Sequence, residues 1–126
     1  MKIAIFENEY ESIKGAFETA NLLRFNKKLE FSVFTSSQNA DFLNIHNYSI
    51  IFIDIDLSSK SFLDGFGVIN KIKEIDDNLM KRTIILTGNN KIKEAMDDRN
   101  ISDPRINIII KPTNYEEISS IIKKIV

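Results

Sequence analysis

The chain has 126 residues, of which 43% are hydrophobic and 28% are charged, and its formal net charge at pH 7 is −1. This length predicts a single domain over residues 1–126 with one buried core. The near-neutral charge gives no electrostatic reason to expect direct binding of nucleic acid or of an anionic membrane. The absence of cysteine excludes disulfides and thiolate zinc sites, and the lone histidine, His46, excludes a multi-histidine metal site.

The N-terminal segment MKIAIFENEYE has too short an apolar run for a signal peptide. No later run approaches the length of a membrane-spanning helix. The sequence therefore predicts a cytoplasmic protein.

Five short runs have the composition of β-strands. In chain order they are residues 3–6, 30–34, 50–53, 84–86 and 108–110. Four of them are continuous and rich in isoleucine, which is typical of parallel strands covered on both faces. The run at 30–34 instead alternates polar and apolar residues, which predicts a strand nearer an edge of the sheet.

Between these runs the apolar period changes to about 3.6 residues, which predicts amphipathic helices. The stripes are Ile13, Ala16, Phe17 and Ala20; Phe66, Ile69 and Ile72; Ile92, Ala95 and Met96; and Ile118, Ile121, Ile122 and Ile125. Ser36 and Ser37 suggest a hydroxyl cap for a further short helix over the apolar residues at 40–43. Thr113 and Glu116 have the spacing of a capping box for the last helix.

The alternation predicts five strand–helix units in an α/β fold. Right-handed crossovers between parallel strands then give a doubly wound, open parallel sheet with helices on both faces. In such a sheet, ligands bind beyond the carboxyl ends of the strands.

The polar residues that follow the predicted strands should therefore meet at one edge. They are Glu7 and Asn8 after the first strand, Asp54 and Asp56 after the third, Thr87 after the fourth and Lys111 after the fifth. Carboxylate and amide oxygens suit a hard cation such as Mg²⁺. An ammonium and a hydroxyl can bind the oxygens of a phosphoryl group, and a carboxylate can accept that group as an acyl phosphate.

These residues, with the motifs IAIFENE, IIFIDIDL, LDGFGVI, IILTG and IIIKP in this order, resemble the receiver domain of bacterial two-component response regulators. The resemblance covers essentially the whole chain. It implies a flavodoxin-like (βα)₅ sheet of strand order 2-1-3-4-5. It also implies a histidine kinase or phosphotransfer protein as phosphoryl donor and a downstream output domain or protein as reader. Such a domain catalyses only its own phosphorylation and dephosphorylation.

The resemblance also implies a role for each site residue. Asp54 becomes the phosphoacceptor, and Mg²⁺ is held by Glu7, Asn8, Asp54 and the backbone carbonyl of Asp56. Thr87 becomes the switch hydroxyl and Lys111 its partner at the phosphoryl group. The implied structural residues are Asp64 and Gly65, which form the turn into the helix over residues 66–72, and Pro112, which follows the lysine through a bond that is commonly cis in the family.

Four features depart from the family pattern. Asn8 replaces the second acid, which predicts weaker Mg²⁺ binding, and Asp56 is a candidate modulator of acyl phosphate lifetime. The loop between Asp54 and Asp64 is longer than usual, and Ser58-Ser59-Lys60 occupies the insertion, which suggests a mobile or partner-specific loop. Ile108 stands where the family often has Tyr or Phe. The last departure is the turn before the final strand, Asp103-Pro104-Arg105, which replaces small residues.

Two alternatives to a phosphorylatable receiver follow from the same residues. Asn8 and Ile108 favour a pseudo-receiver, which is an interaction module that works without phosphorylation. The pair Asp54 and Asp56 also resembles the DxD motif of haloacid-dehalogenase-like phosphatases. That class leaves Glu7 and Asn8 unexplained, and the chain has neither an acidic pair at the end of a further strand after Lys111 nor room for a cap domain.

Overall fold

The computed structural model describes all of residues 1–126. Five parallel strands form one sheet in the order β2-β1-β3-β4-β5. They are β1 (Lys2–Phe6), β2 (Glu30–Phe34), β3 (Ile50–Asp54), β4 (Thr83–Thr87) and β5 (Asn107–Ile110). The order 2-1-3-4-5 of the flavodoxin-like α/β fold is confirmed, as is the position of residues 30–34 at an edge.

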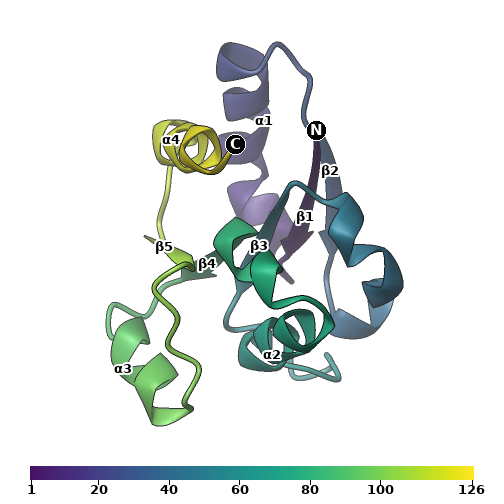
Figure 1. Ribbon diagram of the computed structural model, residues 1–126. Coiled ribbons are helices and arrows are strands. Elements are labelled where there is room, and N and C mark those ends of the chain that lie inside the picture. The colour runs from purple at the N-terminus through teal and green to yellow at the C-terminus, as the bar shows by residue number, and fades with distance from the viewer.

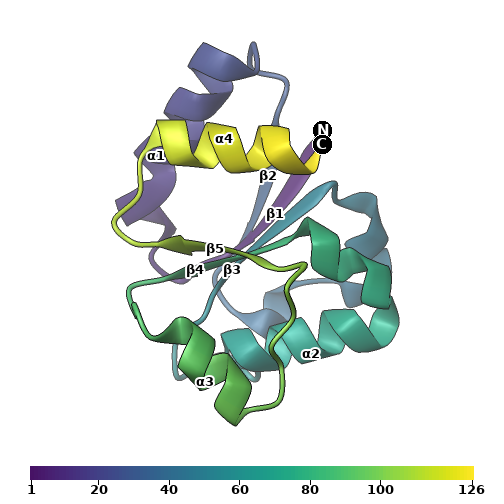
Figure 2. The same ribbon diagram turned by 60° about the vertical axis from the view of Figure 1, so that its left-hand side comes forward.

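Four α-helices cover the two faces of the sheet. They are α1 (Tyr10–Arg24), α2 (Gly65–Ile75), α3 (Ile92–Asp98) and α4 (Tyr115–Ile125). Helices α1 and α4 lie together on one face, and α2 and α3 lie on the other (Figures 1 and 2). The predicted stripes face the sheet, because Phe17, Ile69, Met96 and Ile122 are all buried. No helix combines the length and the apolar character needed to cross a membrane.

The central strand β3 shows how a continuous apolar run fits a strand that is covered on both faces. All five of its residues are buried, and its four apolar side chains pack on two separate cores. Ile50 and Phe52 point toward α1 and α4, while Ile51 and Ile53 point toward α2 and α3. The edge strand β2 has no fully buried residue, in keeping with its alternating sequence.

The segment between β2 and β3 does not form the predicted short α-helix. It consists of two 3₁₀ segments, η1 (Ser37–Asn39) and η2 (Phe42–Asn47). Ser36 makes no capping bond, and the second segment is capped instead by Asp41, which accepts a hydrogen bond from Leu43 N at 3.0 Å. Core-facing residues recur here every third position, at Phe42 and Ile45, and this spacing suits a 3₁₀ turn better than an α-helix.

The predicted capping box at the start of α4 is also wrong. Asn114 is the N-cap, and its side chain accepts a hydrogen bond from Glu117 N at 2.9 Å. Asparagine caps a helix as well as threonine does, so the helix begins one residue later than the Thr113 motif suggested. The hydroxyl of Thr113 is buried without a partner.

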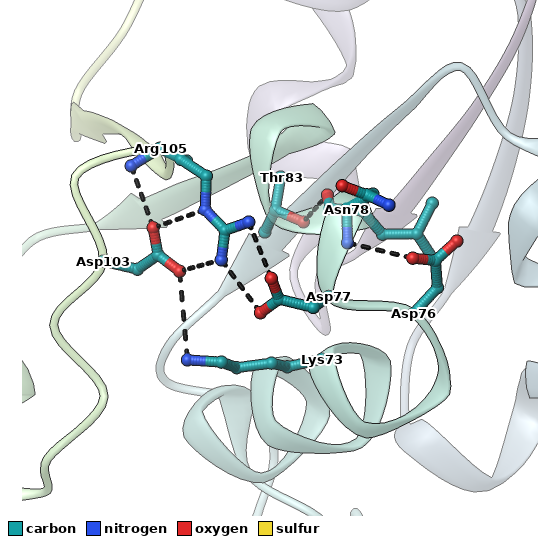
Figure 3. Close-up of polar contacts among 8 residues, drawn as sticks. Lys73, Asp76, Asp77, Asn78, Thr83, Asp103 and Arg105 are labelled. Atoms are coloured by element: carbon teal, nitrogen blue, oxygen red, sulfur yellow. Dashed lines mark hydrogen bonds and ion pairs between the residues drawn. The ribbon is translucent and has the colours of Figure 1, made fainter.

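Charged residues tie the loop before β5 to the third 3₁₀ segment, η3 (Asp77–Arg82), at the amino ends of the strands. Figure 3 shows Arg105 lying between Asp103 and Asp77, with hydrogen bonds of 2.7 to 3.0 Å to both carboxylates. Lys73 on α2 lies 3.9 Å from Asp103. The hydrogen bonds of Arg105 lower the pKa of both aspartates, so the cluster is fully ionised at neutral pH. The unusual turn at residues 103–105 thus has a structural role.

Candidate functional site

Two buried acids lie side by side at the carboxyl ends of the neighbouring strands β1 and β3. Glu7 directly follows β1 and is fully buried, and Asp54 ends β3 with an exposed fraction of 3%. The strands are paired in register, with Phe6 opposite Ile53, so the two acids emerge side by side. Two buried carboxylates at one place need a cation or a proton to offset their repulsion.

Lys111 supplies that positive charge from the loop after β5. Its Nζ donates a hydrogen bond of 2.7 Å to Glu7 Oε1 and lies 3.6 Å from Asp54 Oδ2. Burial by itself lowers the pKa of Lys111, but the hydrogen bond to Glu7 and the charge of Asp54 outweigh it and raise the pKa. Lys111 is therefore a fixed cation at neutral pH. Its backbone N donates to Thr87 O at 2.7 Å, which sets the position of the loop.

Asp54 has the most perturbed carboxyl group of the site. Burial, followed by the adjacent carboxyl group of Glu7, raises the pKa of Asp54 to about 7. The N–H of Asp56, which donates to Asp54 Oδ1 at 3.0 Å, and the charge of Lys111 act in the opposite direction. An ionised Asp54 is thus a desolvated carboxylate, and desolvation strengthens its attraction for cations and its reactivity as a nucleophile.

The chemistry of the two acids suits a divalent cation. Glu7 Oε2 is buried and has no hydrogen-bond partner, so one carboxylate oxygen is unused in a fully buried side chain. Mg²⁺ is commonly bound by one or two carboxylates and several waters. No group of three or more acids or histidines is arranged to hold a metal. The site therefore offers two carboxylates, with Lys111 already offsetting part of their charge.

The remaining predicted residues lie around this centre without touching it through their side chains. Thr87 is fully buried at the end of β4, and its hydroxyl accepts a hydrogen bond from Asn89 N at 3.0 Å. Asp56 is exposed and contacts Asp54 through its backbone N–H alone. The half-buried Asn8 makes no side-chain hydrogen bond. It lines an open hollow of about 660 Å³ with Glu9, Tyr10, Glu11, Ser12, Val33 and Thr35.

Asp64 and Gly65 fix the turn that leads into α2. Asp64 is the N-cap of α2 and accepts a hydrogen bond from Gly67 N at 2.8 Å. Gly65 lies so close to the end of β3 that a Cβ atom there would be 2.4 Å from Asp54 O and 2.4 Å from the Cα of Ile55. Only glycine allows this approach. The peptide bond between Lys111 and Pro112 is cis.

Ile108 lies on β5, away from the acids. It is half-buried and lines a hollow of about 510 Å³ between α3 and β5, together with Ile92, Ile106 and Ile110. This hollow shares no lining residue with the carboxylate pair Glu7 and Asp54.

The sequence analysis missed the anchoring of the loop after β3. Ser37 is almost fully buried, and its Oγ accepts a hydrogen bond from Leu63 N at 2.9 Å, while its N–H donates to Ser61 Oγ at 2.8 Å. Gln38 bonds the same loop through Phe62 N and Lys60 O, each at 2.9 Å. The expectation of a mobile loop is therefore not supported by these contacts. No local pattern reveals bonds between segments more than 20 residues apart.

The fold is that of solved response regulator receiver domains. No protein-family model and no curated protein matches the sequence. Solved structures do match its fold over 98% of the chain.

The receiver domain of NtrX from Brucella abortus is 18% identical with a TM-score of 0.71, and the match covers 96% of that domain. A response regulator receiver domain protein from Clostridium thermocellum is 19% identical with a TM-score of 0.70, and 92% of it is covered. The receiver domain of the sensor histidine kinase PA1611 from Pseudomonas aeruginosa, solved with a magnesium ion in its active site cleft, is 16% identical with a TM-score of 0.70, and 94% of it is covered. The chain spans 26% of the longer NtrX chain crystallised with ATP, to which it is 17% identical with a TM-score of 0.71.

Proposed function

We propose that this chain is a two-component receiver that accepts a phosphoryl group on Asp54 from a phosphohistidine and then presents a changed surface to an output domain or protein. One observation carries the proposal. Asp54 ends the central strand in a buried site, 3.6 Å from the ammonium of Lys111, which is itself bonded to the buried Glu7.

In this reaction a carboxylate oxygen of Asp54 attacks phosphorus, an O–P bond forms and the N–P bond of the phosphohistidine breaks. The electron pair of that bond stays on the imidazole, which takes a proton from solvent. Lys111 Nζ can bind the incoming phosphoryl oxygens, because it already lies 3.6 Å from the carboxylate oxygen Asp54 Oδ2 while it is bonded to Glu7. The Thr87 hydroxyl, which follows the register partner of Asp54 on the neighbouring strand β4, can donate to a further phosphoryl oxygen.

Mg²⁺ would be held by the carboxylates of Glu7 and Asp54, with the Asn8 amide and the carbonyl of Asp56 as neutral oxygen ligands. When bound, it neutralises charge on the phosphoryl oxygens and so lowers the barrier to transfer. Glu7 Oε2, buried and unpartnered, supports this assignment. Because Asn8 stands where the receiver pattern has a second acid, the site has one carboxylate fewer than that pattern, and we expect a low affinity for Mg²⁺.

The phosphorylation assay is acid-labile labelling of the wild type and of Asp54→Asn with acetyl phosphate over a Mg²⁺ titration. We expect labelling of the wild type that rises with Mg²⁺ and none of Asp54→Asn. Asp56→Asn is the matched control, because Asp56 is an exposed acid two residues away, and it should still be labelled. Labelling of Asp54→Asn, or an unlabelled wild type beside a reactive receiver, contradicts the proposal.

A pseudo-receiver is the second candidate, and Lys111 is the observation that favours it. The ammonium already offsets part of the charge of Glu7 and Asp54, so the two acids have a counter-charge in the site without metal or phosphate. In that case the output partner binds the unmodified chain, and Asp54→Asn leaves the affinity unchanged.

A further inference from the structure

Phe62 is the one phenylalanine of the chain that is exposed to solvent. The chain has nine phenylalanines, and the side chain of this one has an exposed fraction of 83%. It lies in the loop of residues 57–63 that contains the insertion Ser58-Ser59-Lys60 (the inserted loop), and the proposed chemistry does not use this loop. A large exposed aromatic side chain is unfavourable in water and is a typical anchor residue of protein interfaces.

The backbone around Phe62 is held in place from outside the loop. Phe62 N donates to Gln38 Oε1, and Leu63 N donates to Ser37 Oγ, each at 2.9 Å. Gln38 Nε2 in turn donates to Lys60 O at 2.9 Å. The exposed ring is thus carried by a pinned backbone, so a partner that buries it loses little conformational entropy in the loop.

The inserted loop also borders the phosphoacceptor. Gly65 N donates to Ile55 O at 3.2 Å, and the position of the missing Gly65 Cβ is 2.4 Å from Asp54 O. Phe62 is three positions before Gly65, so their Cα atoms are at most about 11 Å apart. An interface of ordinary size covers about 800 Å² on each partner, which corresponds to a radius of about 16 Å. A protein centred on Asp54 therefore reaches Phe62.

We propose that Phe62 is an anchor for the protein that delivers the phosphoryl group to Asp54. This inference rests on the proposed function. The donor's phosphorus must contact an oxygen of Asp54, so the donor protein has to cover this edge of the sheet. An output partner, in contrast, can read any face that changes. A small phosphodonor needs neither the loop nor its aromatic side chain, and this difference makes the idea testable.

The experiment compares phosphoryl transfer to the wild type, Phe62→Ala and Phe62→Leu from two kinds of donor. The small donor is acetyl phosphate with Mg²⁺, and the protein donors are the autophosphorylated histidine kinases and phosphotransfer proteins of the same organism, presented singly. Leu43→Ala is the matched control, because Leu43 has an exposed fraction of 90% and lies outside the inserted loop. Since both side chains are exposed, each variant should keep the wild-type fold by circular dichroism.

We expect Phe62→Ala to lower kcat/KM for the productive protein donor by about tenfold through KM, with Phe62→Leu intermediate and Leu43→Ala unchanged. Labelling by acetyl phosphate should be equal in all four proteins. The inference is overturned if every productive protein donor phosphorylates Phe62→Ala as fast as the wild type. It is also overturned if the substitution slows labelling by acetyl phosphate as much as transfer from the protein donor. A loss of self-association on substitution of Phe62 assigns the residue to a second copy and also overturns it. If acetyl phosphate does not label the wild type, the result contradicts the proposed function and not the role of Phe62.

Discussion

The ammonium of Lys111 lies 2.7 Å from the carboxylate of Glu7, although 104 residues separate the two in the sequence. The carboxylate is fully buried and the side chain of Lys111 has an exposed fraction of 23%. The contact joins the loop after β5 to the residue that follows β1, at the carboxyl edge of the sheet. A cation or phosphoryl group that enters the site must therefore displace or share the ammonium of Lys111.

Replacing Lys111 with methionine should destabilise the fold, because Glu7 then remains buried without a counter-charge. Loss of one partner of a buried ion pair costs about 3 kcal/mol in the free energy of unfolding. Urea denaturation at pH 7.5 measures this cost. The double variant Glu7→Gln with Lys111→Met should recover part of the loss, since no unpaired charge is left. Equal stability of wild type and Lys111→Met would contradict the pairing.

Replacing Asp54 with asparagine should stabilise the protein at neutral pH but not in acid. The pKa of Asp54 is raised in the folded state to about 7 from an ordinary value of 3.8, so the folded state binds this proton more tightly. Its stabilising contribution is complete below pH 3.8 and is lost as the pH rises to about 7. The gain of Asp54→Asn over wild type should thus grow across this range to about 4 kcal/mol. Thermal unfolding between pH 4 and 8 measures it, and a gain independent of pH would show that Asp54 is not perturbed.

Replacing Gly65 with alanine should damage both stability and the site. The new methyl group meets backbone atoms of Asp54 and Ile55 at 2.4 Å, and neither can move without shifting the end of β3. We expect a loss of about 3 kcal/mol in urea denaturation. Gly15→Ala is the matched control, because nothing lies within 4 Å of a Cβ at this position in α1. That variant should gain up to about 1 kcal/mol in helix propensity.

Replacing Ser37 with alanine should loosen the inserted loop. The substitution leaves Leu63 N without its acceptor in a part-buried setting, at a cost of about 1 to 2 kcal/mol. Hydrogen exchange of the amides of Phe62 and Leu63 should accelerate. Ser59→Ala, at an exposed serine that makes no side-chain hydrogen bond, should change neither quantity. Unchanged exchange in Ser37→Ala would mean that the contact between the loop and η1 does not hold the loop.

Replacing Asn8 with aspartate should strengthen Mg²⁺ binding if Glu7 and Asp54 hold the ion. A third carboxylate at the site adds a charged oxygen ligand, and we expect the dissociation constant to fall by about tenfold. Isothermal titration calorimetry with MgCl₂ measures the change without phosphorylation. Glu11→Gln, in the same hollow as Asn8 but on α1, serves as a charge control. Equally weak Mg²⁺ binding in Asn8→Asp and the wild type would show that Glu7 and Asp54 do not hold the ion.

The sequence by itself determined the element types wherever one period dominates. The isoleucine runs became strands because a strand buried on both faces needs apolar residues at every position, and the 3.6-residue stripes became helices with one buried face. The ends of these strands also placed Glu7, Asp54, Thr87 and Lys111 at one edge, since parallel strands share their carboxyl ends.

Only the tertiary structure decided the rest. The region before β3 became 3₁₀ turns because Phe42 and Ile45 had to reach a core that the sheet and α2 define. Lys111 pairs with Glu7, and Ser37 with the loop that carries Phe62, through bonds between segments that no local pattern connects. Such contacts depend on where packing brings the segments. For that reason the most specific feature of this chain, an exposed aromatic side chain on a pinned loop beside Asp54, became visible only in three dimensions.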